Sequence, residues 1–286
     1  MKVLNKTANA GGELKKIAPS AALSPFVDMF VLREEVVDGR AVRILPETRS
    51  SVQFRLEDSY WVKERMTSTN WRRVPDISVW GPRHNWGYGY AASHIKIYAF
   101  SLTPAGARAV FCDPVSSYVD RVLDVSDLGL LQELKEVELS DCFETWVGCI
   151  SKILVEFFED FDPTPPISTN AVSMLATGRG GSVTKAAQLE GISPRQFRRR
   201  FTSAYGLGPK QYQRLIRVDR QIRQLHSTPW ERDQFESIPV SFADQAHSIR
   251  EFQEILGMTP MQYWHRKRGA DNTIRSTPEP GVLPPD

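Results

Sequence analysis

Three arginines at helical spacing are the residues of this sequence best suited to binding another molecule. Arg195, Arg198 and Arg199 stand at positions i, i+3 and i+4, so on a helix they project together. In the major groove of DNA, a guanidinium can bind the O6 and N7 atoms of guanine through two hydrogen bonds. Arg200 lies further round the helix, where it would reach a phosphate oxygen rather than a base. The spacing predicts DNA recognition, and the alternative is a merely solvated basic helix.

The residues around these arginines specify two short helices joined by a tight turn. Gly191 can adopt the left-handed conformation that ends the first helix. Ser193 followed by Pro194 is a typical start for the second helix. The apolar positions of both helices recur at helical spacing: Val183, Ala186, Ala187, Phe197, Phe201 and Ala204. The segment 182–208 is therefore predicted to be a helix-turn-helix unit.

A second segment of this kind follows at 242–263, and the pair resembles the two motifs of AraC/XylS-type transcription regulators. In the first motif the matching residues are Ala187, Gly191, Ser193, Phe197, Arg200, Phe201, Gly206, Pro209 and Tyr212. In the second they are Phe242, Asp244, Gln245, His247, Arg250, Phe252, Gly257, Thr259, Pro260 and Tyr263. The resemblance covers 170–266 and implies a double-stranded DNA operator as partner, with one long helix joining the two units.

The second unit departs from the family pattern. Pro239 falls inside its expected supporting helix, Ser241 replaces a glycine, and Ser248 stands where a large apolar residue is usual. Its exposed polar positions, Gln245 and Arg250, are predicted to contact bases. They are fewer and less basic than those of the first unit, so the first unit is expected to supply most of the base reading.

Charge is distributed unevenly along the chain. The whole sequence has a net charge of +2, but residues 1–170 carry a net −4 and residues 171–270 a net +8. Such asymmetry is typical of a nucleic-acid-binding half joined to another domain. Lys210 and Arg214, at the start of the connecting helix, are predicted to contact phosphates.

The N-terminal half has a different pattern, of short strands from residue 24 to about 111. Ile95 and Ile97 lie on one face of a predicted strand, whereas Tyr98 and Phe100 lie on the other. Both faces are mostly apolar, which indicates a sheet buried on both sides or the wall of a barrel. Helical spacing follows over 127–137 and 142–161, and residues 120–162 carry 12 acidic and 3 basic side chains.

This half resembles the cupin-like sensor domain of one subgroup of these regulators. The matching positions are Ser24, Pro25, Phe26, Val27, Ile44, Leu45, Pro46, Phe100, Pro104, Gly106 and Ala107. The expected fold is an α+β N-terminal cupin-like β-barrel domain with acidic helices, followed by an all-α double helix-turn-helix domain.

Proline-rich segments mark the expected domain boundaries. Residues 1–23 are expected to be a flexible tail, 24–161 a sensor or dimerisation domain, and 162–166 a linker with three prolines. Residues 167–268 should be the DNA-binding domain, and 269–286 a disordered, proline-rich tail.

An aromatic, glycine-rich run offers the best ligand-pocket candidates: Trp80, Trp86 and Tyr88. The same side chains would serve equally well as core. His84 and His94 lack the close spacing of a cupin metal site, so neither a metal nor a cofactor is expected. No apolar run is long enough for a membrane span, and three cysteines without a signal peptide favour a cytoplasmic protein.

The sequence thus predicts a DNA-binding transcription regulator and not an enzyme. Control is expected through a small, unidentified effector or through homodimerisation of the N-terminal half, with RNA polymerase as a partner if it activates transcription. Two alternatives stay open: a regulator-like protein that has lost ligand sensing, and a cupin-type enzyme that its C-terminal half recruits to DNA.

Overall fold

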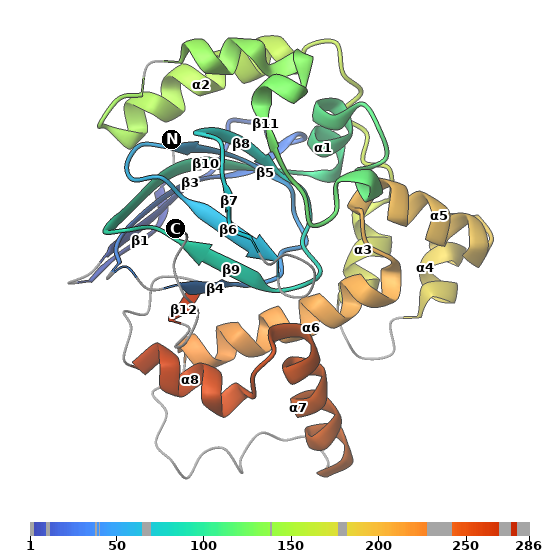
Figure 1. Cartoon of the computed structure of the whole chain (residues 1–286). Helices are drawn as coiled ribbons and strands as arrows, with labels where there is room; N and C mark the ends of the chain where they lie inside the picture. The colour runs from blue at the N-terminus through green and yellow to red at the C-terminus, as the bar shows by residue number, and fades with distance from the viewer. Residues whose placement is uncertain are drawn as a thin grey trace.

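Two antiparallel sheets and a set of helices make up the computed structural model (Figure 1). It describes residues 3–9, 12–37, 39, 41–64, 70–137, 139–176, 182–227, 242–268 and 276–278. The sheets and the helices α1 and α2 occupy the N-terminal half, and helices alone form most of the C-terminal region. This arrangement confirms the expected α+β half followed by a helical domain.

The larger sheet has seven strands in the order β1-β2-β3-β10-β5-β8-β11. Their bounds are Val3–Asn9, Gly12–Ile17, Val27–Val36, His94–Leu102, Ser51–Arg55, Ile77–Trp80 and Val122–Asp124. The smaller sheet has five strands in the order β12-β4-β9-β6-β7. Their bounds are Ser276–Pro278, Val42–Ile44, Gly87–Tyr90, Trp61–Glu64 and Arg72–Arg73.

The central strand β10 is buried on both faces. Ile95 and Ile97 pack with Tyr60 and Val62 into a core that lies between the two sheets. On the other face, Tyr98 and Phe100 join a larger core beneath the helices. Two-sided burial explains why β10 reads as a nearly continuous apolar run, and it confirms that prediction from the sequence.

The two sheets do not close into a single barrel among the described strands. The edges of the larger sheet are β1 and β11, and neither forms a ladder with the smaller sheet. One isolated bridge, between Glu47 and Arg83, links the connections on this side. The N-terminal half is therefore a sandwich of two sheets, with the β1–β2 hairpin at one edge of the larger sheet.

The expectation of flexible ends is wrong where the structure describes them. Strand β2 pairs with β3 over its whole length, and Ile17 and Leu23 are fully buried, so 12–23 belongs to the sheet and its core. At the other end, Ser276–Pro278 pairs with β4, which ties part of the supposed disordered tail to the smaller sheet. The rest of 269–286 lies outside the described residues.

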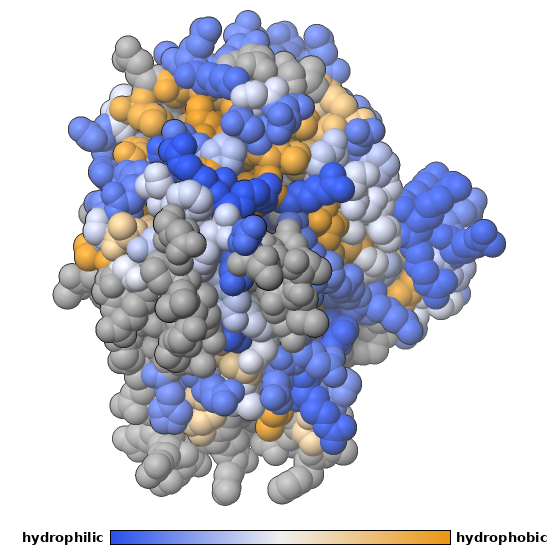
Figure 2. Space-filling view, viewed as in Figure 1, coloured by the Kyte–Doolittle hydropathy of each residue, from blue (hydrophilic) through white to orange (hydrophobic). Residues whose placement is uncertain are grey.

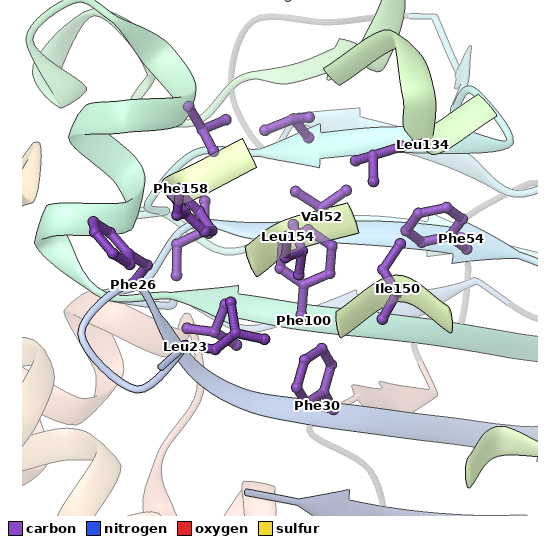
Figure 3. Close-up of a cluster of buried hydrophobic side chains, with 14 of the residues drawn as sticks. Leu23, Phe26, Phe30, Val52, Phe54, Phe100, Leu134, Ile150, Leu154 and Phe158 are labelled. Atoms are coloured by element: carbon purple, nitrogen blue, oxygen red, sulfur yellow. The ribbon is translucent and has the colours of Figure 1, made fainter. Parts of the chain in front are cut away.

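Helix α2 (Phe143–Phe158) covers the outer face of the larger sheet. Its apolar stripe includes Trp146, Ile150 and Leu154, which are fully buried. Figure 3 shows Ile150 and Leu154 over side chains of β3, β5 and β10. Helix α1 (Pro104–Phe111) begins at an N-cap, where the Thr103 hydroxyl accepts a hydrogen bond from the backbone of Gly106. Over 127–137 the chain forms 3-10 helix, Gly129–Glu136, instead of an α-helix.

Trp146 is the centre of this core, because its ring meets Phe54 and Tyr98 with centroids 5.3 and 5.1 Å apart. Replacing it with alanine should lower the free energy of unfolding by about 3–5 kcal/mol, since a large cavity would remain. Chemical denaturation measures the loss. The control is Val155→Ala on the same helix, where a side chain in a 45% exposed residue should cost less than about 0.5 kcal/mol. Equal effects of the two substitutions would contradict this account of the core.

Six helices follow in the C-terminal region of the described chain. They are α3 (Thr169–Ala176), α4 (Val183–Leu189), α5 (Pro194–Tyr205), α6 (Pro209–Ser227), α7 (Phe242–Leu256) and α8 (Pro260–Arg268). The segment between α2 and α3, which contains the proline-rich stretch 162–166, has neither helix nor strand. Pro239 and Ser241 of the expected second supporting helix lie outside the described residues.

Candidate nucleic-acid interface

The first helix-turn-helix unit is built from α4 and α5, and local hydrogen bonds fix both helix starts. The Ser182 hydroxyl accepts from the backbone N–H of Lys185 at 3.0 Å. Ser193 and Gln196 form a reciprocal capping box at the start of α5. Gly191, with a φ of 64°, makes the turn between them. The sequence signals for this unit therefore act as expected.

Helix α5 has one buried face and one strongly basic face. Phe197 and Phe201 are fully buried in a core shared with α3 and α4. The four predicted DNA-contacting residues of this helix are all exposed: Arg195, Arg198, Arg199 and Arg200. Figure 2 shows the projecting lobe of α4 and α5 covered by hydrophilic residues. Capping and core packing thus hold the arginines on a rigid helix that projects from the molecule.

The long helix α6 connects the two units, as the resemblance implied. Leu215, Val218 and Ile222 are buried in a core with residues of α7 and α8. At its start, the ring of Tyr212 packs edge-on against Phe201 of the first unit, 5.2 Å between centroids. Lys210 is exposed at the first turn, where a phosphate could reach it. One helix therefore belongs to the cores of both units.

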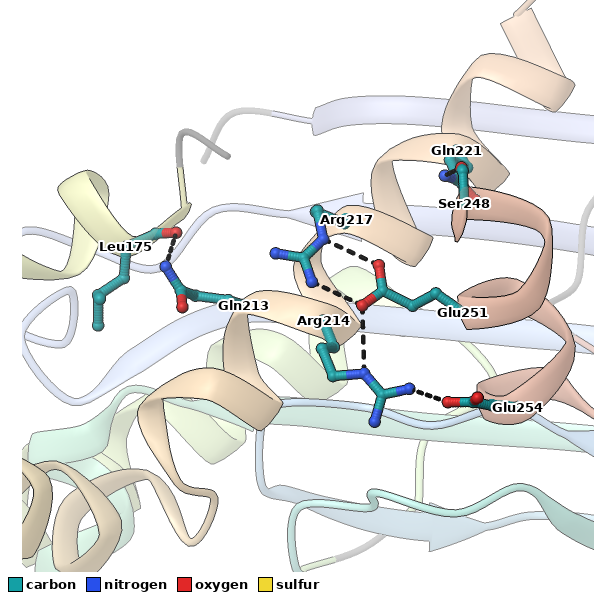
Figure 4. A network of polar contacts seen from close by, with 8 residues as sticks. All are labelled: Leu175, Gln213, Arg214, Arg217, Gln221, Ser248, Glu251 and Glu254. Atoms are coloured by element: carbon teal, nitrogen blue, oxygen red, sulfur yellow. Dashed lines mark hydrogen bonds and ion pairs between the residues drawn. The ribbon is translucent and has the colours of Figure 1, made fainter. Parts of the chain in front are cut away.

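Arg214 is less available to a phosphate than the sequence suggested. Its Nε donates to Glu251 Oε1 at 3.1 Å, and its Nη2 pairs with Glu254 (Figure 4). Arg217, one turn further on, donates to both oxygens of Glu251 at 2.8 and 2.6 Å. The Glu251 side chain is only 4% exposed, so two arginines of α6 bind one buried carboxylate of α7.

This network fixes the angle between α6 and α7 and perturbs the groups in it. Burial alone would raise the pKa of Glu251, but the hydrogen bonds and positive charges of Arg217 and Arg214 hold it below the ordinary 4.5. The same hydrogen bond raises the pKa of Arg217. The sequence did not show this role of Arg214, because the partner carboxylate lies 37 residues away.

Replacing Glu251 with glutamine should lower the free energy of unfolding by about 2 kcal/mol near pH 7, because it removes a charged acceptor from two arginines. A carboxylate with a depressed pKa stabilises the fold above its unfolded pKa of about 4.5, and this stability disappears as the pH falls through the folded value. The difference between wild type and variant should therefore keep its full size from about pH 7 down to about pH 5 and shrink as the pH falls below about 4.5. Thermal unfolding across that range measures it.

The matched control is Glu254→Gln, where the replaced side chain is 66% exposed. It should change stability by less than about 0.5 kcal/mol at any pH, since exposed ion pairs contribute little. A pH-independent difference for Glu251→Gln would mean that the carboxylate charge does not join the two helices.

The second recognition helix, α7, exposes a smaller set of side chains. Arg250 is exposed, and so is Ile249, an apolar residue with 40% of its surface accessible. Gln245 lies within α7, but its side chain is outside the described residues. Ser248, which replaces a large apolar residue, instead hydrogen-bonds to Gln221 of α6. A polar contact thus stands where the family would pack a hydrophobic side chain.

The three ligand-pocket candidates lie in two different places. Trp80 is buried between the sheets, with the guanidinium of Arg83 4.8 Å from its ring. Trp86 and Tyr88 contact each other edge to face, with centroids 5.3 Å apart, in the smaller sheet and the loop before it. The structure therefore brings two of the three together, with Trp80 apart from them.

Trp86 also joins the N-terminal half to the second unit, a contact that sequence reasoning missed. A Cβ atom at Gly257 would lie 2.5 Å from the indole nitrogen of Trp86, so only glycine admits this contact. Arg43 stacks on the same ring at 3.8 Å and donates to the carbonyl of Leu256, where α7 ends, at 2.6 Å. Leu45 lies in the α6–α7 core. The smaller sheet thus holds the second unit directly.

His84 and His94 are the two histidines of the N-terminal half. His84 pairs with Asp120, and His94 with Glu34, at separate positions. Among the described residues, no group of three or more His, Cys, Asp or Glu side chains could hold a metal ion. In the same part of the chain, no helix has the length and apolar character that crossing a membrane requires.

Comparisons with known proteins agree with the geometry of the C-terminal region. A family model described as "Helix-turn-helix domain" matches residues 186–268, while no curated protein matches the chain. The region is therefore a helix-turn-helix domain of the AraC type, as its two motifs indicated.

Three solved structures are similar to the chain at low identity. ToxT of Vibrio cholerae strain SCE256, bound to an unsaturated fatty acid, has 9% identity and a TM-score of 0.45, with 82% of this chain and 94% of that chain covered. The AraC-like transcriptional activator CuxR has 12% identity and a TM-score of 0.29, with 76% and 81% covered. Oxalate decarboxylase of Bacillus subtilis has 7% identity and a TM-score of 0.24, with 34% and 27% covered.

Proposed function

We propose that this chain is a sequence-specific transcription regulator that reads DNA chiefly through α5. The observation that carries the proposal is the set of exposed arginines on a capped helix in an AraC-type domain. Arg195, Arg198 and Arg199 lie in the first two turns of α5, at the end that enters the major groove in helix-turn-helix proteins. Each can bind a guanine through two hydrogen bonds.

The second unit has a different share of the work in this proposal. Arg250 is the one cation at its predicted base-contacting positions, and Gln245 is the other polar residue there. Arg214 and Arg217 are bound to Glu251 and orient α7. Lys210 and Arg200 would contact phosphates, which place the domain on DNA without reading its sequence. Base selectivity should therefore come mainly from the first unit.

Replacing Arg195 or Arg199 with alanine should weaken specific binding by about 1–3 kcal/mol and relax the preference at one base pair. Replacing Arg250 should weaken specific binding less, because Arg250 is the one cation at the base-contacting positions of the second unit and the first unit supplies most of the base reading. The measurement is a binding series against a panel of base-substituted operators, selected from random DNA and held at constant salt.

Arg73→Ala is the control. Arg73 is exposed on β7, so its replacement removes the same positive charge at a site far from α5. It should leave the operator panel unchanged. If Arg250→Ala abolishes discrimination while Arg195→Ala and Arg199→Ala preserve it, the two units have the opposite roles.

The N-terminal half would control DNA binding by responding to a small effector or by forming a homodimer. Support comes from its contacts with both units. At the end of α5, a Cβ atom on Gly206 would lie 2.9 Å from Val119 and 3.1 Å from Pro82. Arg43 and Leu45 hold the second unit. A rearrangement of the sandwich would therefore change the angle between the recognition helices. If the protein activates transcription, RNA polymerase is the further partner.

Weakening the contact between Leu45 and the second helix-turn-helix unit should reduce the protein's selectivity for the spacing of operator half-sites. Leu45 is 5% exposed, and its replacement with alanine should cost about 2–5 kcal/mol of local packing. The wild type should prefer operators whose half-sites lie one helical turn apart, roughly 34 Å, over operators shifted by half a turn. Leu45→Ala should narrow that preference, as measured by competition binding. Val36→Ala, at a 70% exposed position, is the control, and an unchanged preference in Leu45→Ala would argue against coupling.

A further inference from the structure

Arg55 lies in the N-terminal sandwich, on the face of the larger sheet that packs against the smaller sheet. It ends β5, where it stands directly opposite Ile97 of β10. Ile97 in turn stands opposite Arg33 of β3. Residues directly opposite on antiparallel strands share a face. Since Ile97 belongs to the core between the sheets, the row Arg33, Ile97 and Arg55 faces the smaller sheet.

The Arg55 guanidinium is buried without a hydrogen-bond partner from the chain. The residue is 7% exposed, and none of its Nε, Nη1 and Nη2 atoms has a partner in the part of the chain that the structure describes. The guanidinium carbon lies 4.7 Å from the centroid of the Tyr60 ring. Arg43, the other buried arginine among the described residues of the sandwich, differs from Arg55 because its guanidinium donates a hydrogen bond to a backbone carbonyl.

The nearby carboxylates are already bound to other arginines. Glu35 pairs with Arg33 at 2.8 Å, and Asp76 pairs with Arg73 at 3.2 Å. Burial lowers the pKa of Arg55 to about 10, which still leaves the group charged at neutral pH. A buried charge without a partner costs several kcal/mol. An anion bound at this point would offset that cost.

We propose that Arg55 anchors a binding site for a small organic carboxylate between the two sheets. The planar guanidinium matches a carboxylate through two parallel hydrogen bonds. The core between the sheets includes Tyr60, Val62, Val74 and Ile97, whose apolar and aromatic side chains suit the hydrocarbon part of such an acid better than an inorganic dianion. The positive charges of Arg33 and Arg73 also act on this position and favour an anion there. Binding itself does not require DNA, whereas its use as the control signal rests on the function proposed above.

The test is thermal unfolding of the full chain with acetate, benzoate or octanoate, and with benzamide as the neutral analogue of benzoate. At least one carboxylate should raise the Tm in a saturable way, and benzamide should not. Arg55→Met should abolish the rise, and without carboxylate this variant should be more stable than the wild type, because it removes an unpaired buried charge. Arg55→Lys should retain a smaller rise, since lysine lacks the fork.

Arg121→Met is the matched control, because it removes an exposed arginine of the same half and should keep the full response. A wild type that responds to none of the three acids, or an equal response in Arg55→Met, would overturn the proposal. Stabilisation by inorganic phosphate alone would overturn the assignment to carboxylates.

Operator binding by the same variants separates this inference from the proposed function. Arg55→Met should still select the wild-type operator, because Arg55 is remote from α5. If Arg55→Met selects the operator but no carboxylate raises the Tm of the wild type, the carboxylate site is disproved and the proposed function is not affected. If the wild type selects no operator but Arg55 still governs a carboxylate response, the proposed function fails and the site stands.

Discussion

The buried stripe of α6 is the constraint on which the arrangement of the C-terminal region depends. Its first turn packs Tyr212 against Phe201 of the first unit. Further along, Leu215 and Val218 share a core with α7, α8 and Leu45 of the N-terminal half. A single helix that contributes to three structural units transmits their positions to one another, because packed interiors resist small displacements. The two recognition helices are therefore placed by one rigid element.

Ion pairs between α6 and α7 stabilise this packing further. The carboxylate of Glu251 is buried, and it is bound by arginines that lie one turn apart on α6. A buried ion pair needs good geometry to offset desolvation, so it selects one relative orientation of the helices. The first unit has no comparable network among its described arginines of α5, which are exposed instead. Arg214 and Arg217 of α6 therefore hold α7 in place, whereas the arginines of α5 are available to bind a ligand.

The core of the N-terminal sandwich is almost entirely apolar, in contrast to the charged contacts between the helices of the C-terminal region. Burial on both faces of β10 stabilises the N-terminal half, and this requirement fills most of the space between the sheets with apolar side chains. Arg55 is an exception to that chemistry. Its charge lies in a core where nearby carboxylates have other partners. Local departures from core chemistry are where binding sites are expected, since a protein stores unfavourable interactions where a ligand can relieve them.

The sequence by itself determined the first helix-turn-helix unit and the two-sided strand β10. The signals for this unit are local: the cap at Ser193, the turn at Gly191 and the spacing of the arginines. Each acts within a few residues, so it can be read from the sequence without knowledge of distant contacts. Only the tertiary structure decided the roles of Arg55, Glu251 and Trp86. Each depends on partners far along the chain, and a sequence does not reveal which distant residues meet once its strands and helices have packed.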